Sequence, residues 1–220
     1  MTTCILIPAY NAEKTIMAVV QDCLQHNMPL IVVDDGSTDG TAQLVATLPL
    51  TLLRHARNRG KGAALKTGFA WALEAGFDGV VTIDADGQHD VSAIPQLVAA
   101  ARDASPGIVI ASRHGQFEQM AGLRKIWNRI GVWFMRTRTG FEITDSQSGF
   151  RHYSGTLLKQ ISLNSEGYSF EMEILIKAWK RGFCISSIPV PALVADGRST
   201  SHYKPFSDTF SISMTFLRYM

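Results

Sequence analysis

The chain has few cysteines, and they are not arranged as in cysteine-based sites. Three occur in 220 residues, and none stands in a Cys-x-x-Cys pair: Cys4, Cys23 and Cys184. An odd number without such a pair argues against a disulfide framework and against a zinc site. The cysteines are therefore expected to be small core residues of a protein that stays in a reducing, cytoplasmic compartment.

Long hydrophobic runs and a strong net charge are also missing. No window reaches the ~18 consecutive apolar residues of a membrane-spanning helix, and the opening MTTCILIPAYN lacks the pattern of a signal peptide. The formal net charge is only +2, which gives no reason to expect a nucleic-acid partner. We expect a cytoplasmic protein whose membrane contact, if any, is peripheral and on the cytoplasmic face.

Two common nucleotide-binding signatures are absent. The chain has no GxxxxGK[ST] sequence, which excludes a P-loop protein. GKGAAL, at 60–65, ends in leucine where the dinucleotide fingerprint needs glycine or alanine, and no acidic residue stands in the matching strand context. A Rossmann dehydrogenase is therefore not expected.

The sequence does contain a regular alternation of apolar strands and amphipathic helices. Hydrophobic residues make up 46% of the chain, enough for one large core. Strands are expected at 4–10, 30–36, 51–56, 79–86, 107–112 and 183–193, with a loop and a further strand at 145–153. Helices are expected at 12–26, 37–48, 60–76, 91–103, 121–137 and 169–182. Near-continuous apolar strands favour an α/β fold with a mostly parallel central sheet and helices on both faces.

Acidic residues follow two of these strands. Asp34 and Asp35 end the second strand, and Asp84 and Asp86 end the fourth. Ligands of open parallel sheets bind at the carboxyl ends of the strands, where these ends should meet the residues after the first strand. In extended backbone Asp84 and Asp86 would point the same way, and their repulsion would raise one pKa unless a cation were bound. Mg²⁺ or Mn²⁺ takes such oxygen ligands and also binds phosphate, so we expect a divalent cation here; the competing interpretation is a solvated turn with acidic helix caps.

Six motifs in order carry a family resemblance. They are IPAYNAEKTI, VVDDGSTDGT, NRGKGAALKTGF, TIDADGQHD, DSQSGFR and SHYKPFSD, and the resemblance that they carry covers roughly residues 3 to 208. Together they resemble family 2 glycosyltransferases with the GT-A fold, and within them the dolichyl- or polyprenyl-phosphate sugar synthases. The resemblance implies one catalytic domain over 1–220. Its parts would be a nucleotide-sugar half at 1–112, an acceptor half with a lid at 113–208, and a tail at 209–220 that could lie in a membrane interface.

The resemblance also implies the residues that hold the donor, a UDP- or GDP-sugar. Those expected at the nucleotide and diphosphate are Pro8, Ala9, Tyr10, Asp35, Arg57, Lys61, Arg198 and Lys204. Those expected at the Mn²⁺ or Mg²⁺ ion are Asp84, Asp86, Gln88 and His202. Asp34 could instead support its own turn, and Ala12 stands where family members usually carry glutamate, which leaves the role of Glu13 open. His89 is expected to point away from the metal, and no site role is expected for His26, His55, His114 or His152.

The acceptor follows from the same resemblance. In the lipid-phosphate subgroup, arginines at the positions of Arg113 and Arg124 contact the acceptor phosphate, which is ionised near neutral pH and needs cations rather than a base. A hydroxyl acceptor would need a carboxylate within hydrogen-bonding reach. Asp145 could be that base, or it could orient arginines such as Arg151, which is the interpretation we favour slightly. The apolar stripe of 121–137 could face either a membrane interface or the core.

Three functions remain open on this basis. The first is metal-dependent, inverting transfer of the sugar to a lipid phosphate of the polyprenyl or dolichyl type. The second is transfer to a hydroxyl of a saccharide or glycolipid, with Asp145 as base. The third is a sugar-nucleotide-binding protein without turnover.

Overall fold

The computed structural model describes residues 2–103, 107–113, 148–165 and 170–191. The strands in this part are β1 (Thr3–Ala9), β2 (Leu30–Asp34), β3 (Thr51–Arg54), β4 (Gly79–Thr82), β5 (Ile108–Arg113), β6 (Arg151–Ser154) and β7 (Ile185–Val190). The helices are α1 (Ile16–Leu24), α2 (Thr41–Val45), α3 (Lys61–Glu74), α4 (Ile94–Asp103), α6 (Gly155–Gln160) and α7 (Phe170–Lys180), with a 3₁₀ turn η1 (Val91–Ala93) before α4. The expected helix at 121–137 and the expected tail at 209–220 lie outside these residues.

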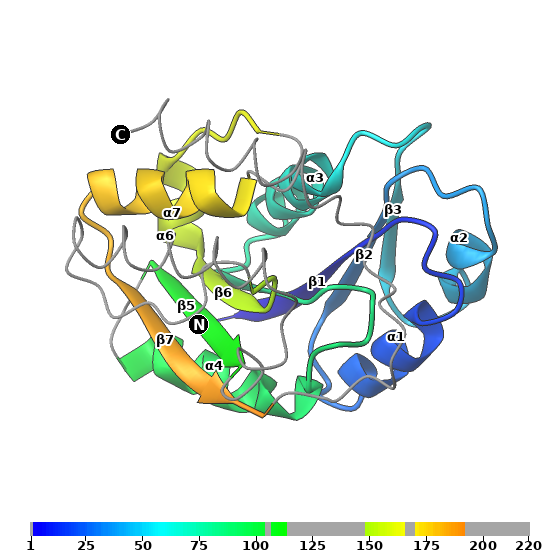
Figure 1. Cartoon of the computed structure of the whole chain (residues 1–220), viewed down its shortest axis with the longest axis horizontal. Helices are drawn as coiled ribbons and strands as arrows, with labels where there is room; N and C mark the ends of the chain where they lie inside the picture. Colours follow the sequence, from blue (N-terminus) through cyan, green and yellow to red (C-terminus); the bar gives the residue numbers. More distant parts are fainter. Residues whose placement is uncertain (1, 104–106, 114–147, 166–169, 192–220) are drawn as a thin grey trace, which may run out of the picture.

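The strands form one seven-stranded sheet in the order β3-β2-β1-β4-β6-β5-β7. β1 pairs in parallel with β2 and β4, β2 with β3, and β5 with β7. β6 lies antiparallel between β4 and β5, an orientation that the sequence did not predict. The expected mostly parallel sheet with helices on both faces is confirmed (Figure 1).

Alternate residues of the strands point to two separate cores. On β1, Cys4 and Leu6 pack against one cluster, while Ile5 and Ile7 pack against the other. Helices α3, α6 and α7 cover the first face, and α1 and α4 cover the second (Figure 1). Because every residue of β1 and β2 is buried, these central strands have no solvent-facing side and read as continuous apolar runs.

The fourth strand is shorter than expected. β4 ends at Thr82, and the chain then turns through Gly87, whose φ of +72° lies in the left-handed region. The expectation that Asp84 and Asp86 project side by side from extended backbone is therefore wrong. A turn this tight needs a residue without a Cβ, which the glycine supplies.

Helix α6 was not foreseen in the sequence, although its start carries a recognisable signal. The Ser154 hydroxyl accepts a hydrogen bond from the backbone N–H of Leu157 at 3.2 Å, which is an N-cap. At six residues the helix is too short to show periodicity. In the described part of the chain, no helix is both long and apolar enough to cross a bilayer.

Candidate active site

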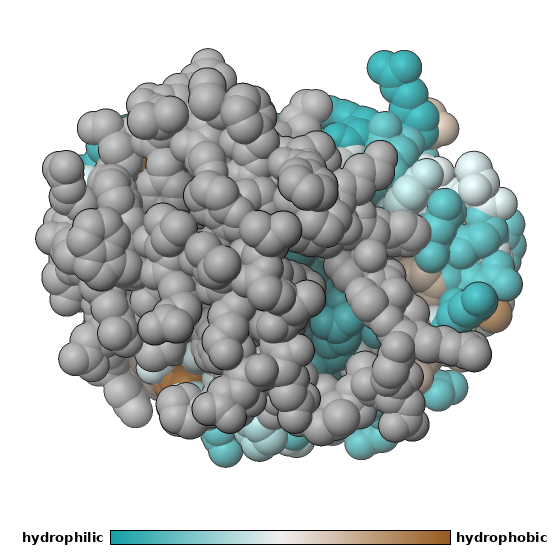
Figure 2. Space-filling model, in the orientation of Figure 1, coloured by the Kyte–Doolittle hydropathy of each residue, from teal (hydrophilic) through white to brown (hydrophobic). Residues whose placement is uncertain are grey.

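The strand ends that carry the motifs do meet at one edge of the sheet. β1 lies between β2 and β4, so the residues after these three strands are neighbours. Pro8 and Ala9 are buried at the end of β1, where Ala9 pairs with Asp34, and Tyr10 is partly exposed. The described surface beside this edge, around α2 and the loop after β3, is hydrophilic (Figure 2).

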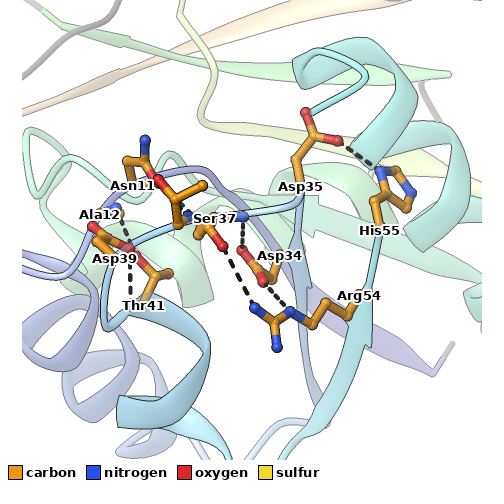
Figure 3. Close-up of polar contacts among 10 residues, drawn as sticks. Asn11, Ala12, Asp34, Asp35, Ser37, Asp39, Thr41, Arg54 and His55 are labelled. Atoms are coloured by element: carbon orange, nitrogen blue, oxygen red, sulfur yellow. Dashed lines mark hydrogen bonds and ion pairs between the residues drawn. The ribbon is translucent and has the colours of Figure 1, made fainter. Parts of the chain in front are cut away.

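Hydrogen bonds join the loop after β1 to the loop after β2 (Figure 3). The backbone N–H of Asn11 donates to the Ser37 hydroxyl, and the Asn11 side chain accepts from the N–H of Thr38, both at 2.9 Å. A Glu13 carboxylate oxygen accepts from the N–H of Gly40 at 2.7 Å. Glu13, whose role the sequence left open, therefore fastens the second loop to the first.

Asp34 supports its own turn, as one interpretation of the sequence expected. One oxygen accepts from the backbone N–H of Ser37 at 3.0 Å, and the other lies 2.8 Å from Arg54 Nε (Figure 3). The Asp34 side chain has no exposed surface, and its charge is balanced by the Arg54 guanidinium, whose side chain is half-exposed.

Asp35 organises the loop that leads into α3. Its oxygens accept from the N–H of Arg59 at 3.0 Å and of Gly60 at 2.7 Å. The third contact is His55 Nδ1 at 2.6 Å (Figure 3). A carboxylate offers about four acceptor positions, so about one remains. The expected contact of Asp35 with the base or ribose stays a prediction and would use that position.

Lys61 lies between two carboxylates. Its Nζ is 2.6 Å from Asp84 Oδ1 and 2.6 Å from Glu171 Oε1, and the exposed fractions of the three side chains are 17%, 24% and 10%. Burial alone would lower the pKa of Lys61, but the Asp84 and Glu171 carboxylates raise it above its ordinary value. The carboxylates of Asp84 and Glu171 thus hold Lys61 as a cation. Glu171, on α7, is a site residue that the sequence did not reveal.

Asp84 is held from several sides. Burial by itself would raise its pKa, but the Lys61 ammonium and the His89 ring hold that pKa well below the usual range. A Cβ on Gly149 would lie 2.3 Å from Asp84 Oδ2, so the glycine backbone rests directly on the carboxylate. Thr82 keeps Gly149 there, because its hydroxyl donates to the Gly149 carbonyl at 2.7 Å.

His89 points toward the site, and the expectation that it points away is wrong. Its Nε2 lies 3.6 Å from Asp84 Oδ2, and its ring packs 5.5 Å, centre to centre, from that of Phe150. The turn after β4 causes this, because it brings His89 close to the Asp84 carboxylate.

Asp86 has the electrostatic character expected of a cation ligand. Its pKa is raised, first by burial and then by the negative charge of Asp84, although its carboxylate also accepts from the Gln88 N–H at 3.0 Å. Oxygen donors of this kind suit Mg²⁺ or Mn²⁺, which would offset the repulsion between the carboxylates. The residues therefore fit a divalent ion, although no group of three His, Cys, Asp or Glu side chains in the described ranges could hold one alone.

Arg151 is buried rather than turned toward an acceptor. It has no exposed surface, and its guanidinium donates to the backbone carbonyls of Ser148 at 2.7 Å and Glu171 at 3.0 Å. It therefore joins the loop before β6 to α7, and the expected contact with an acceptor finds no support in this geometry. Arg57, by contrast, is exposed on the loop after β3.

Several expected site residues fall where the structure gives no description. Arg113 ends β5, but its side chain lies outside the described part, as do all of Arg124, Asp145, Arg198, His202 and Lys204. Their roles stay predictions. The geometry thus brings together the carboxylates of Asp84, Asp86 and Glu171 with Lys61, beside the loops that follow β1 and β2.

Comparison with known proteins gives a consistent result. The model of glycosyl transferase family 2 matches residues 4–165. The UDP-N-acetylglucosamine–dolichyl-phosphate N-acetylglucosaminyltransferase of Methanococcus voltae is 33% identical, with 87% of this chain and 86% of the relative covered. The polyprenol monophosphomannose synthase of Mycolicibacterium smegmatis is 30% identical, with 86% of this chain and 76% of the relative covered. The undecaprenyl-phosphate mannosyltransferase of Micrococcus luteus is 31% identical, with 84% of this chain and 81% of the relative covered.

Solved structures show the same fold. Glucosyl-3-phosphoglycerate synthase of Mycobacterium tuberculosis, in a complex with Mn²⁺, UDP and glucosyl-3-phosphoglycerate, aligns with a TM-score of 0.76 at 22% identity. The alignment covers 99% of this chain and 79% of that one. The GT-A fold expected from the motifs is thereby confirmed.

Proposed function

Because the chain belongs to glycosyl transferase family 2 and is a glycosyltransferase, we propose that it moves a sugar from a UDP- or GDP-sugar to a lipid phosphate. The acceptor would be of the polyprenyl or dolichyl type, and the transfer would invert the configuration at the transferred carbon. Three relatives named for transfer to lipid phosphates support this acceptor. The observation that carries the proposal is the cluster of Asp84, Asp86, Lys61 and Glu171 at the carboxyl edge of the sheet.

A divalent ion, Mn²⁺ or Mg²⁺, would be held mainly by Asp86. When bound, the ion would act as a Lewis acid that neutralises the diphosphate leaving group. Asp86 is favoured over Asp84 because its pKa is raised, whereas the charge of Asp84 is balanced by Lys61. Gln88 and His202 remain proposed as further ligands.

The cluster of Lys61, Asp84 and Glu171 is suited to the hydroxyl groups of the donor sugar. An ammonium supplies three donors and carboxylates supply acceptors, so one hydroxyl can both give and receive a hydrogen bond here. The cluster keeps enough exposed surface for contact with a ligand, and the Gly149 backbone packs against the Asp84 carboxylate, where a side chain would clash. We assign these residues to binding and orienting the sugar.

The acceptor phosphate needs cationic residues to hold it, and Arg113 and Arg124 are proposed for this role. A phosphate that is already ionised can attack the sugar without a general base. The second candidate, transfer to a hydroxyl with Asp145 as base, would give an ordinary glycoside, whereas a glycosyl phosphate breaks in mild acid. An acid-stable product with every lipid acceptor tested would favour this second candidate.

The donor and metal assignments can be tested by thermal unfolding with UDP or GDP and Mn²⁺. A ligand at one hundred times its Kd stabilises by about 2.7 kcal/mol, which is about 5–10 °C for a chain of this length. Asp86→Asn should lose the metal-dependent part of this shift. Asp90→Asn should keep the metal-dependent shift. Asp90 lies four residues after Asp86, and its side chain caps η1 by accepting from the Ser92 N–H. Equal shifts in both variants would contradict the assignment of the metal to Asp86.

A further inference from the structure

A chain of hydrogen bonds runs beside Lys61, and we propose that its members, Asp35, His55 and Thr67, are positioning residues that act through Lys61. They hold α3 at the place where the Lys61 ammonium reaches both Asp84 and Glu171. The inference rests on the proposed function, in which Lys61 contacts the donor sugar. It gives His55, for which the sequence suggested no site role, a part in the transfer.

The first anchor of α3 is the residue before Lys61. The N–H of Gly60 donates to Asp35 Oδ2 at 2.7 Å. Gly60 has a φ of +93°, in the region that favours glycine, and it caps the start of α3. Because Asp35 directly follows β2, this bond ties the start of the helix to the end of a central strand.

The second anchor lies further along the helix. Asp35 Oδ1 lies 2.6 Å from His55 Nδ1, and His55 Nε2 lies 2.9 Å from the Thr67 hydroxyl. Since the ionised carboxylate only accepts, Nδ1 carries the proton, and in the neutral ring Nε2 accepts from Thr67. The Asp35 and His55 side chains are only 3% and 7% exposed, so water competes little for these bonds.

The two anchors and a close contact with the sheet fix α3. Thr67 lies six residues after Lys61, or about 9 Å along the helix axis. At the next position, a Cβ on Gly68 would lie 2.3 Å from Leu6 Cδ1, so the helix already touches β1 and cannot move closer. What stays adjustable is a slide or rotation of the helix, and a misplacement of about 1 Å can cost about a hundredfold in rate.

Thr67 offers a matched pair of variants for the test. Thr67→Val removes the hydroxyl and keeps the shape, while Thr67→Ser keeps the hydroxyl. We expect Thr67→Val to lower kcat for sugar transfer about tenfold, which is about 1.4 kcal/mol in the barrier. The affinity for UDP or GDP, measured by calorimetry, should stay within about twofold, because Asp35 keeps its bonds from the Arg59 and Gly60 N–H groups when the Thr67 hydroxyl is lost. Thr67→Ser should restore kcat to within about twofold of the wild type.

A second measurement does not depend on activity. Acetylation of lysines by an N-hydroxysuccinimide ester, followed by mass spectrometry, reports how well Lys61 is held between its carboxylates. In Thr67→Val the acetylation rate of Lys61 should rise about threefold or more, which is a loss of about 0.7 kcal/mol of protection. The rate of Lys159, which lies on α6, should not change, and it serves as the internal reference.

The outcomes separate the alternatives. Unchanged Lys61 acetylation in Thr67→Val overturns the proposal, and so does an equal loss of kcat in Thr67→Ser. If the wild type transfers no sugar to any lipid phosphate, the proposed function fails, but the acetylation comparison still decides on the positioning role. Should Thr67→Val fail to fold, His55→Asn takes its place, because its amide can reach Asp35 but not Thr67.

Discussion

Replacement of Lys61 by methionine tests the electrostatic centre of the site. Lys61 is the cation between Asp84 and Glu171, with an oxygen of each at 2.6 Å. Methionine has a similar length and no charge, so the variant leaves two largely buried carboxylates facing each other. We expect the folded state to be destabilised, because like charges repel and neither carboxylate keeps this hydrogen-bond donor.

The size of the effect follows from the burial of the three side chains. Removal of one partner from a buried ion pair costs about 3–5 kcal/mol. Since these side chains keep between 10% and 24% of their surface exposed, the lower figure applies, and the loss should be about 3 kcal/mol. For a chain of this length that corresponds to a fall in Tm of about 6–12 °C.

The assay is thermal unfolding of the wild type and of Lys61→Met, with Lys66→Met as the control on the same helix. The control should change stability by no more than about 0.5 kcal/mol. The folded pKa of Asp84 lies well below its usual range, so its contribution is fully present above the unfolded pKa and is lost progressively as pH falls through the folded pKa. The difference between the two proteins should therefore be largest at pH 7 and should narrow as the solution is acidified from about pH 4 toward pH 2. Equal Tm values at pH 7, or a difference that grows on acidification, would refute the reasoning.

Two further predictions concern glycine and histidine positions near the central strands. In Gly149→Ala the new Cβ would meet Asp84 Oδ2 at 2.3 Å, so the carboxylate or the loop must move, at a cost of about 1–3 kcal/mol. Transfer activity should fall more than tenfold, and activity equal to the wild type would show that the contact is unimportant. Burial lowers the pKa of His152 from 6.5 to about 4, so the unfolded chain binds a proton that the folded chain does not. Stability should fall by about 3 kcal/mol from pH 6.5 to pH 4, and His152→Leu should flatten this part of the pH profile in chemical unfolding.

Local patterns in the sequence were sufficient for the strands and helices that frame the site. The apolar runs that became β1, β2 and β4 predicted buried parallel strands, and the acidic residues after two of them predicted where their ends would meet. The boundaries were less accurate, because strand and helix ends depend on turns such as the one at Gly87. The antiparallel direction of β6 was not predicted, since a run of four residues has no feature that fixes its direction relative to its neighbours.

Local sequence patterns did not predict most of the side-chain contacts within the site. Asp84 and Asp86 look alike in the sequence, yet burial and their neighbours shift their pKa values in opposite directions. His89 turned inward and Arg151 was buried, against expectation, because each is held by a group distant in the sequence: the Phe150 ring for His89 and the Glu171 carbonyl for Arg151.

The sequence by itself determined the family, most of the strands and helices, and the edge of the sheet where the motifs meet, because these depend on periodicity and on motifs within short segments. The tertiary structure alone decided which carboxylate meets which cation. Lys61 and Glu171 are separated by 110 positions in the chain, and only the packing of α3 and α7 on the same face of the sheet brings them within 2.6 Å. Charge balance depends on distance in space, which short sequence patterns do not record.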